Sequence, residues 1–250
     1  MLEINKIHLG DSYELIKQIP DKSIDCIYTD VPYLFDSHGK GHSELAIRME
    51  NKNIDLIDLQ DGFDYEILFE FLRVMKKINI IIWCSSLQLR YILNFFMENG
   101  ATTFRLLTWH KLNPSPTTNN NWLPDTEYAI HFREKNLCVN DGYDLKSTFY
   151  LSAINKNDKD NYEHPTIKPL DLIRRHLLHI TQPNDLVLDC FSGSGTTCVA
   201  AKELNRRFIG IEINPRYHKI SVDRLNGISK FGQTSIFTDF EQLSIAEERK

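Results

Sequence analysis

The chain lacks the features that mark membrane-spanning and exported proteins. Its longest apolar stretch, NIIIWC at residues 79–84, is too short to cross a bilayer, and the N-terminus MLEINKIHLG has no basic start followed by an apolar block. With 250 residues, of which 42% are hydrophobic and 25% charged, it has the size and composition of a globular protein with one substantial core. We therefore expect a cytoplasmic protein with no membrane partner.

Cysteine is scarce, and its placement excludes two further classes of protein. The five cysteines form no Cys-x-x-Cys pair and show no Cys/His ligand spacing; they are Cys26, Cys84, Cys138, Cys190 and Cys198. This pattern argues against a disulfide framework and a zinc site, and we predict no metal ligand in the chain. Several of these cysteines fall in predicted strands or helices, where a free thiol packs as a small apolar side chain.

An excess of positive charge is also missing. The chain carries 29 Lys and Arg against 34 Asp and Glu, which gives a net charge of −5. This balance excludes a protein whose whole surface attracts nucleic acid. A local basic groove is still compatible with it, because electrostatic steering depends on how the charges are distributed.

What the chain does contain is a regular alternation of short apolar runs with longer helical patterns. The predicted strands are residues 4–9, 23–29, 78–84, 103–110, 127–133, 186–191 and 207–213. The predicted helices are residues 12–18, 65–75, 86–99, 169–181, 196–204 and 215–225. This order predicts an α/β fold with a mostly parallel, doubly wound sheet and helices on both faces. A single domain spanning residues 1–250 accounts for it.

Two stretches interrupt the alternation. Residues 34–62 are largely polar and are too long for a simple connection in a compact domain, so we expect an insertion there. Residues 111–125 include the sequence KLNPSPTTNNNWLPD, whose prolines and asparagines are incompatible with a regular element. Residues 227–250 look like a C-terminal tail, in which we expect one short helix.

A glycine-rich turn is the first motif that indicates chemistry. In DLVLDCFSGSGTTCVAAKELNRRFIGIEIN, a strand leads to Gly193 and Gly195, a helix begins at Thr196, and a second strand ends at Glu212. Glycines let a ligand approach the backbone, the helix N-terminus presents amides, and an acid about 20 residues later accepts hydrogen bonds from ribose hydroxyls. No Gly-Lys-Ser/Thr follows the turn, which disfavours a triphosphate and leaves dinucleotides and S-adenosylmethionine as ligands.

Three motifs in a defined order carry a family resemblance: TDVPYLF, EHPTIKPLDLIRRHL and LDCFSGSGTT…FIGIEINPRYHKISVDRL. They resemble the amino-group DNA methyltransferases of the β class, in which the catalytic segment precedes the cofactor segment, and in particular small bacterial or phage members. The resemblance extends over residues 7–225. It implies a Rossmann-like S-adenosylmethionine-dependent methyltransferase fold with permuted motif order, S-adenosyl-L-methionine as cofactor and DNA as partner.

The family's catalytic pattern is Asp/Asn/Ser-Pro-Pro-Tyr/Phe, and the corresponding residues of this chain are Asp30, Val31, Pro32 and Tyr33. The resemblance implies direct methyl transfer to the exocyclic amine of a flipped base. The Asp30 carboxylate and the main-chain carbonyl of Val31 would accept the amine hydrogens, and the Tyr33 ring would stack on the base. Val31 departs from the pattern: it keeps the carbonyl but loses the fixed φ of proline, which predicts a less rigid turn.

The cofactor residues carry over position by position. They are Asp11, His164, Thr166, Lys168, Asp189, Phe191, Gly193, Ser194, Gly195, Thr196 and Glu212. By resemblance, Asp11 lies near the adenine of the cofactor, Glu212 holds its ribose, and the segment containing His164, Thr166 and Lys168 lines its methionine portion.

These observations lead to the interpretation that the chain is a site-specific DNA methyltransferase acting on adenine N6. In this family Asp at position 30 is commonly associated with adenine, and Ser with cytosine N4. Cytosine N4 is the alternative target, and Val31 motivates a second alternative, a catalytically silent DNA-binding or cofactor-sensing relative. We expect the insertions at 34–62 and 111–125 to read the target, with Trp122 as a base contact. A homodimer and a cognate restriction endonuclease are further partners that the resemblance suggests.

Overall fold

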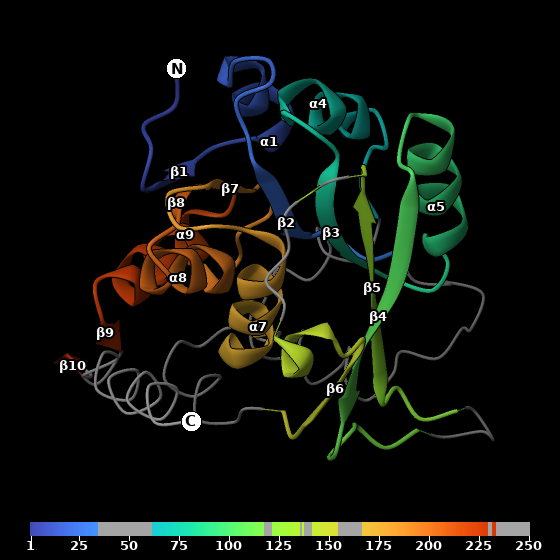
Figure 1. Ribbon diagram of the computed structural model, residues 1–250. Coiled ribbons are helices and arrows are strands. Elements are labelled where there is room, and N and C mark those ends of the chain that lie inside the picture. The colour runs from blue at the N-terminus through green and yellow to red at the C-terminus, as the bar shows by residue number, and fades with distance from the viewer. Residues whose placement is uncertain are drawn as a thin grey trace.

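The computed structural model describes residues 1–34, 62–117, 122–135, 137, 142–154, 167–229 and 232–233 (Figure 1). Its main feature is a central sheet with the strand order β1-β8-β7-β2-β3-β5-β4-β6. The bounds of these strands are β1 Lys6–Leu9, β2 Cys26–Asp30, β3 Asn79–Cys84, β4 Thr103–Lys111, β5 Thr126–Arg133, β6 Phe149–Ser152, β7 Leu186–Asp189 and β8 Arg207–Glu212. None of the helices in these ranges is long and apolar enough to span a bilayer.

The direction of the strands places the candidate residues at one edge of the sheet. Strands β1, β8, β7, β2 and β3 pair in parallel, β5 is antiparallel to both β3 and β4, and β4 pairs in parallel with β6. Within this sheet β5 alone therefore runs against the others. The carboxyl ends of parallel strands are where open α/β sheets bind ligands, and the amino end of β5 lies at that same edge.

Helices cover both faces, as expected for a doubly wound fold (Figure 1). They are α1 Ser12–Leu15 with η1 Ile16–Gln18, α4 Ile67–Val74, α5 Leu89–Glu98, η2 Tyr143–Lys146, α7 Leu170–Ile180, α8 Thr196–Glu203 and α9 Pro215–Leu225. One core cluster joins α4 and α5 to Ile27 and Ile82, whereas the other joins α7 and α8 to Tyr28 and Trp83. Neighbouring strand residues thus point to opposite faces, and each face carries its own apolar layer.

The structure confirms the predicted class of fold and changes several boundaries. The predicted strand at 4–9 begins only at Lys6, because Asn5 adopts a positive φ of 63° that interrupts extended backbone. The predicted helix at 86–99 begins only at Leu89, since the preceding residues form a turn. Within the described part of 112–125 there is no helix or strand, in agreement with its proline content. The insertion at 34–62 lies almost entirely outside the described residues.

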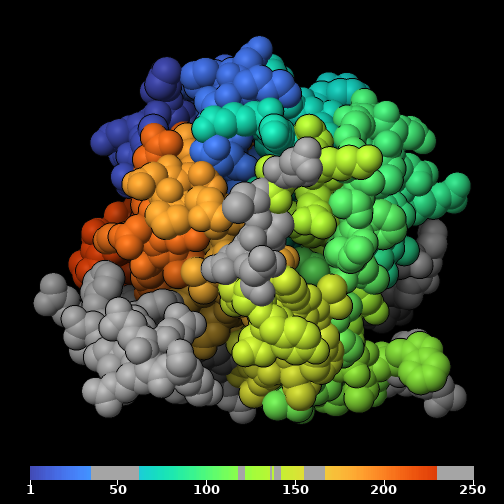
Figure 2. Space-filling view, in the orientation of Figure 1, coloured from blue at the N-terminus to red at the C-terminus, as the bar shows by residue number. Residues whose placement is uncertain are grey.

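Two elements of the structure, η2 and β6, were not predicted from the sequence. They lie against α7 and fill the lower centre of the face in Figure 2. Arg175 of α7 fixes them there: its guanidinium donates to the carbonyl oxygens of Ser147 and Phe149, the latter at 3.4 Å, and lies 5.9 Å from the Tyr150 ring. In the described part of the tail two short strands pair, β9 Ile228–Ser229 and β10 Gly232–Gln233. The rest of the tail, for which a short helix is expected, lies outside the described residues.

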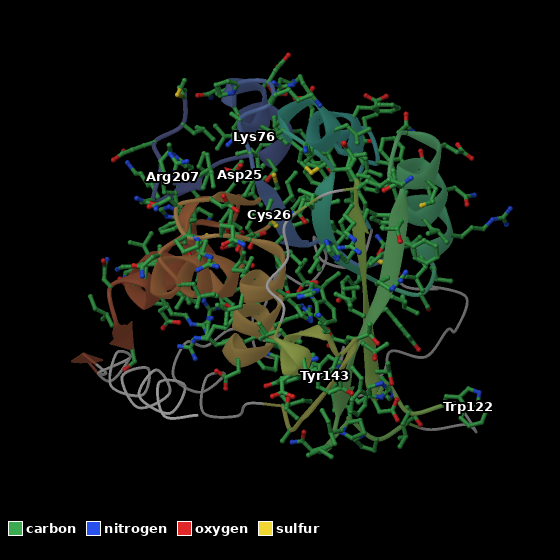
Figure 3. All side chains as sticks on the ribbon, viewed as in Figure 1. Asp25, Cys26, Lys76, Trp122, Tyr143 and Arg207 are labelled. Carbon is green, nitrogen blue, oxygen red and sulfur yellow. The ribbon has the colours of Figure 1, made fainter. Side chains whose placement is uncertain are left out.

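Figure 3 shows the two opposite edges of the sheet. Asp25, Cys26 and Arg207 mark the amino ends of β2 and β8, where Asp25 forms an ion pair with Lys76 at 2.6 Å. Trp122, which is 97% exposed, lies far from this edge, beyond the carboxyl end of β4. The insertion at 111–125 therefore leaves the sheet at the edge expected for a ligand site.

Candidate active site

The catalytic motif forms a turn at the carboxyl end of β2. Asp30 is the last residue of the strand and pairs with Trp83 of β3. The backbone N–H of Val31 donates to the Trp83 carbonyl over 3.2 Å, and the Pro32 carbonyl accepts from the Gln88 amide over 2.9 Å. The chain therefore leaves the sheet in a defined conformation, with Val31 buried beneath the turn.

Lys168 brings a positive charge directly to this turn. It lies just before α7, and its ammonium forms an ion pair with Oδ2 of Asp30 and donates to the Tyr33 hydroxyl over 3.2 Å. The same Nζ lies 4.9 Å from the Trp83 ring centroid and 5.4 Å from that of Tyr33. Lys168 is predicted from the sequence to be a cofactor residue, whereas its contacts are with Asp30 and Tyr33, the predicted catalytic residues.

Asp30 keeps one oxygen without a partner. Its Oδ1 is buried and has no hydrogen bond to any described residue, although Oδ2 is held by Lys168. A buried carboxylate oxygen normally finds a donor, because leaving it unpaired costs free energy. The unpaired Oδ1 therefore marks a position at which a donor group from a ligand would be stabilised.

Glu127 and Lys111 extend the ion pair of Asp30 and Lys168 into a row of four alternating charges, and neither was predicted from the sequence as a site residue. Glu127 lies near the start of β5, where its Oε2 is 3.1 Å from Lys168 and its Oε1 is 2.6 Å from Lys111. The Tyr33 hydroxyl also donates to Glu127 Oε2 over 3.4 Å. The sequence did offer one sign of Glu127, an acid at the start of an otherwise apolar strand. To assign Glu127 to the site from this sign, one must know that β5 runs antiparallel, which brings its amino end to the ligand edge.

The protonation equilibria of this cluster follow from burial and from the alternation of charges. Burial raises the pKa of Asp30, and the Lys168 ammonium opposes that rise. Burial would also raise the pKa of Glu127, but Lys168 and Lys111 outweigh it and lower this pKa to about 2. Burial alone would lower the pKa of Lys168, yet Asp30 and Glu127 raise it above its ordinary value. At neutral pH Lys168 and Glu127 are therefore both charged.

The second part of the site is the glycine-rich turn after β7. Gly193 and Gly195 have positive φ angles of 49° and 75°, which are left-handed conformations that favour glycine. A Cβ at Gly195 would lie 2.9 Å from the Cβ of Ser221 and 3.2 Å from Ile7, so this glycine also permits close packing. Gly195 provides no side-chain cap to α8, which leaves the first amides of that helix without a side-chain acceptor.

Two predicted acids lie together beside this turn. Glu212 ends β8, and its carboxylate accepts from the backbone N–H of Gly193 over 2.7 Å and from that of Asn214 over 2.8 Å. Asp11 follows β1, which pairs with β8, and it caps α1 by accepting from the Tyr13 N–H over 2.9 Å. Burial raises the pKa of Glu212, whereas Asp11 is exposed. Both carboxylates therefore lie near the turn, and their role in holding a cofactor remains a prediction.

Three other predicted cofactor residues, Ser194, Thr196 and Phe191, pack against side chains from other parts of the chain. The hydroxyls of Ser194 and Thr196 lie 3.2 and 2.6 Å from the guanidinium of Arg224 on α9, so both side chains face a buried positive charge. Arg224 was missed because a lone arginine on a polar helix resembles a solvated surface residue. Phe191 is half-buried, and its ring centroid lies 6.4 Å from that of Phe63.

A hydrogen bond between β2 and β7 joins the two parts of the site. Asp189, at the end of β7, accepts from the Thr29 hydroxyl over 3.0 Å and from the Phe191 N–H over 3.2 Å. Burial raises the pKa of this carboxyl to about 7. Because Thr29 precedes Asp30, the bond fixes the end of β2 that carries Asp30 against the end of β7 that leads into the glycine-rich turn. The predicted residues His164 and Thr166 lie outside the described residues.

Comparison with known proteins gives matches over most of the chain. The model of the N6/N4 DNA methylase family matches residues 24–223, a range that includes both Asp30 and Glu212. The type II methyltransferase M2.LlaDCHI of Lactococcus lactis subsp. cremoris is 32% identical over 242 residues, which cover 89% of this chain and 90% of the relative. The type II methyltransferase M2.DpnII of Streptococcus pneumoniae is 31% identical, with 86% and 87% of the two chains covered.

The fold is also similar to a solved structure with bound cofactor. The crystal structure of the M1.HpyAVI–SAM complex superimposes with a TM-score of 0.65 at 28% sequence identity, covering 88% of this chain and 98% of that chain. The similarity thus covers most of both chains.

Proposed function

This chain belongs to the N6/N4 DNA methylase family and uses S-adenosylmethionine to methylate DNA, and we propose that its target is adenine N6 at a specific sequence. The support for adenine is the carboxylate at position 30, the residue type that the family commonly pairs with this base. Direct transfer to a flipped base requires acceptors for the amine hydrogens and a cofactor site opposite them.

The observation that supports transfer to an exocyclic amine is Oδ1 of Asp30, which has no partner among the described residues. An exocyclic amine is a poor nucleophile because its lone pair is delocalised into the ring. Acceptors at its hydrogens favour the pyramidal nitrogen that attacks a methyl group. Lys168 already holds Oδ2, so Oδ1 is the oxygen that can accept from the amine, with the Val31 carbonyl as the second acceptor.

The residues of the glycine-rich turn fit S-adenosylmethionine. When bound, the cofactor supplies an electrophilic methyl group on a sulfonium. Gly193 and Gly195 allow a ligand to approach the backbone, and Glu212 and Asp11 offer acceptors for ribose hydroxyls and for an adenine amine. The hydrogen bond from Thr29 to Asp189 keeps this turn beside Asp30.

The proposal also covers how the protein recognises its target sequence and whether it assembles with partners. We assign recognition of the target sequence to the insertions at 34–62 and 111–125 within a single methyltransferase domain, and Trp122 presents an exposed ring for base contact. A homodimer and a cognate restriction endonuclease remain predictions from the family resemblance.

A methyl-transfer assay tests the target atom. The purified protein is incubated with labelled S-adenosylmethionine and unmethylated genomic DNA, and the DNA is then digested and its nucleosides are separated. We expect the label in N6-methyladenine. Label in N4-methylcytosine would replace adenine by cytosine as the target. Cofactor binding without transfer to any DNA would instead favour the catalytically silent alternative.

A further inference from the structure

We infer that Gln88 is a positioning residue for the catalytic turn, and that it takes over the restraint which the first proline of the family pattern would supply at position 31. The inference depends on the proposed function, since it assigns Gln88 to the turn that carries Asp30. Its basis is a pair of hydrogen bonds, one on each side of Val31 and Pro32, that together fix the turn without a second proline ring.

The side chain of Gln88 is completely buried, and both of its polar groups are used. Its Oε1 accepts from the Ser85 backbone N–H over 2.9 Å, and its Nε2 donates to the Pro32 carbonyl over 2.9 Å. A buried amide that loses either partner carries a free-energy penalty, so the side chain has one strongly preferred orientation. Gln88 therefore ties the catalytic turn to the rigid junction between β3 and α5.

Val31 contributes the second hydrogen bond, and proline could not form it. The Val31 N–H donates to the Trp83 carbonyl over 3.2 Å, which extends the pairing of β2 with β3 by one residue beyond Asp30. Proline has no N–H to donate. Val31 is also restricted by the ring of Pro32, because a residue that precedes proline is confined to extended conformations.

The two hydrogen bonds have a direct consequence for the reacting groups. The Asp30 carboxylate and the Val31 carbonyl are the two proposed acceptors of the target amine. Along the chain, the Val31 carbonyl lies between the Trp83 contact and the Gln88 contact, and Asp30 immediately precedes the Trp83 contact. Loss of the Gln88 amide would release the Pro32 end of this segment. A displacement of about 1 Å in catalytic geometry can cost about 100-fold in rate.

A mutant cycle of Gln88→Met and Val31→Pro tests the inference. We expect Gln88→Met to lower kcat by about 10- to 100-fold, with the Kd for S-adenosylmethionine changed by less than about 2-fold. Val31→Pro alone should keep kcat within about 5-fold, because the ring replaces the lost hydrogen bond. In the Val31→Pro background, Gln88→Met should cost less than about 5-fold. Gln88→Glu, which retains the size but places an oxygen against the Pro32 carbonyl, should behave like Gln88→Met.

The control is Asn99→Leu, at the other end of α5. Asn99 donates from its side-chain amide to the Phe95 carbonyl over 2.8 Å, so this variant removes a helix-end hydrogen bond without touching the turn. It should leave kcat unchanged even where it lowers the melting temperature. A similar loss of kcat in Asn99→Leu would overturn the positioning role, as would equal costs of Gln88→Met in the two backgrounds or an inactive Val31→Pro variant.

Amide hydrogen exchange of Val31 and Tyr33 tests the inference without relying on catalysis. Gln88→Met should speed exchange of the Val31 N–H, because the Gln88 side chain no longer holds the Pro32 carbonyl on the far side of the turn, and Asn99→Leu should not. Unchanged exchange in Gln88→Met would overturn the inference. A wild-type protein that transfers no methyl group would instead overturn the proposed function and leave this measurement valid.

Discussion

The catalytic turn and the glycine-rich turn are neighbours at one edge of the sheet, but different interactions stabilise them. At the catalytic turn, the charges of Asp30, Lys168, Glu127 and Lys111 alternate in sign, with Lys168 buried and the other three partly buried, and one oxygen of Asp30 has no partner among the described residues. At the glycine-rich turn, side chains bond mainly to backbone groups and hydroxyls: Glu212 accepts two backbone amides and Arg224 donates to two hydroxyls.

This difference follows from what each turn has to do. A ligand that binds through backbone amides needs a turn of fixed shape, which hydrogen bonds between backbone and buried side chains provide. A reacting amine needs a strong acceptor whose charge is balanced but whose hydrogen-bonding capacity is not exhausted. Substitutions at the catalytic turn should therefore change turnover, and substitutions at the glycine-rich turn should change cofactor affinity.

The largest expected effect is that of Asp30→Ala. It removes the carboxylate that accepts from the amine, so kcat should fall at least about 1,000-fold. The Kd for S-adenosylmethionine should stay within about 2-fold, because the glycine-rich turn is untouched. Labelled methyl transfer to unmethylated DNA measures the first quantity and calorimetric titration the second.

Asp25→Ala is the matched control, because it removes a carboxylate that lies just before the amino end of β2, the strand whose carboxyl end carries Asp30. Asp25 pairs with Lys76 and accepts from the Leu186 N–H over 2.9 Å, so its loss should lower stability and leave transfer by the folded protein intact. Near-normal turnover of Asp30→Ala would show that the catalytic assignment is wrong.

The next effect in size is that of Gly193→Val on cofactor binding. Val is strongly disfavoured at a φ of 49°, so the turn would have to rearrange and the backbone amide would leave Glu212. We expect the Kd for S-adenosylmethionine to rise about 100-fold. Calorimetric titration of both proteins measures it.

A glycine of similar conformation outside the site controls for backbone strain. Gly100 has a φ of 107° and follows α5, far along the chain from either turn. Gly100→Val should lower the melting temperature and leave the Kd for S-adenosylmethionine unchanged. If Gly193→Val bound the cofactor as tightly as the wild type, the turn would not be the cofactor site.

The glycine-rich turn was also the part of the site that sequence predicted best. A βαβ unit places its glycines, helix start and acid at fixed separations along the chain, so Gly193, Gly195, Thr196 and Glu212 could be proposed from spacing alone. The predicted order of strands and helices succeeded for the same reason, because periodicity reports local structure.

The charges around Asp30 could not be predicted in this way. Glu127 and Lys111 come from β5 and β4, and the contacts of Glu127 with Lys168 and with Lys111 depend on the antiparallel direction of β5. No spacing along the chain encodes that direction. The η2 and β6 elements were missed because β6 is short and largely exposed, so it lacks an apolar pattern of its own.

The smallest expected effect is that of Glu127→Gln, which keeps the size of the side chain but removes its charge. Lys168 retains Asp30 as a partner, so kcat at neutral pH should fall by no more than about 10-fold. The Glu127 carboxylate raises the pKa of Asp30, and its removal leaves Lys168 to lower that pKa further. Asp30 would then stay ionised to lower pH, and the acid limb of the profile of kcat against pH should move toward lower pH.

Glu203→Gln is the control that distinguishes this electrostatic effect on Asp30 from the general effect of losing an ion pair. Glu203 pairs with Arg174 at 2.6 Å between α7 and α8, so its substitution should destabilise the fold without moving the acid limb. An acid limb that stayed in place or moved to higher pH in Glu127→Gln would mean that Asp30 is not the titrating acceptor. The contrast between the two turns would then reflect packing alone, because the charges at the catalytic turn would have no role in the reaction.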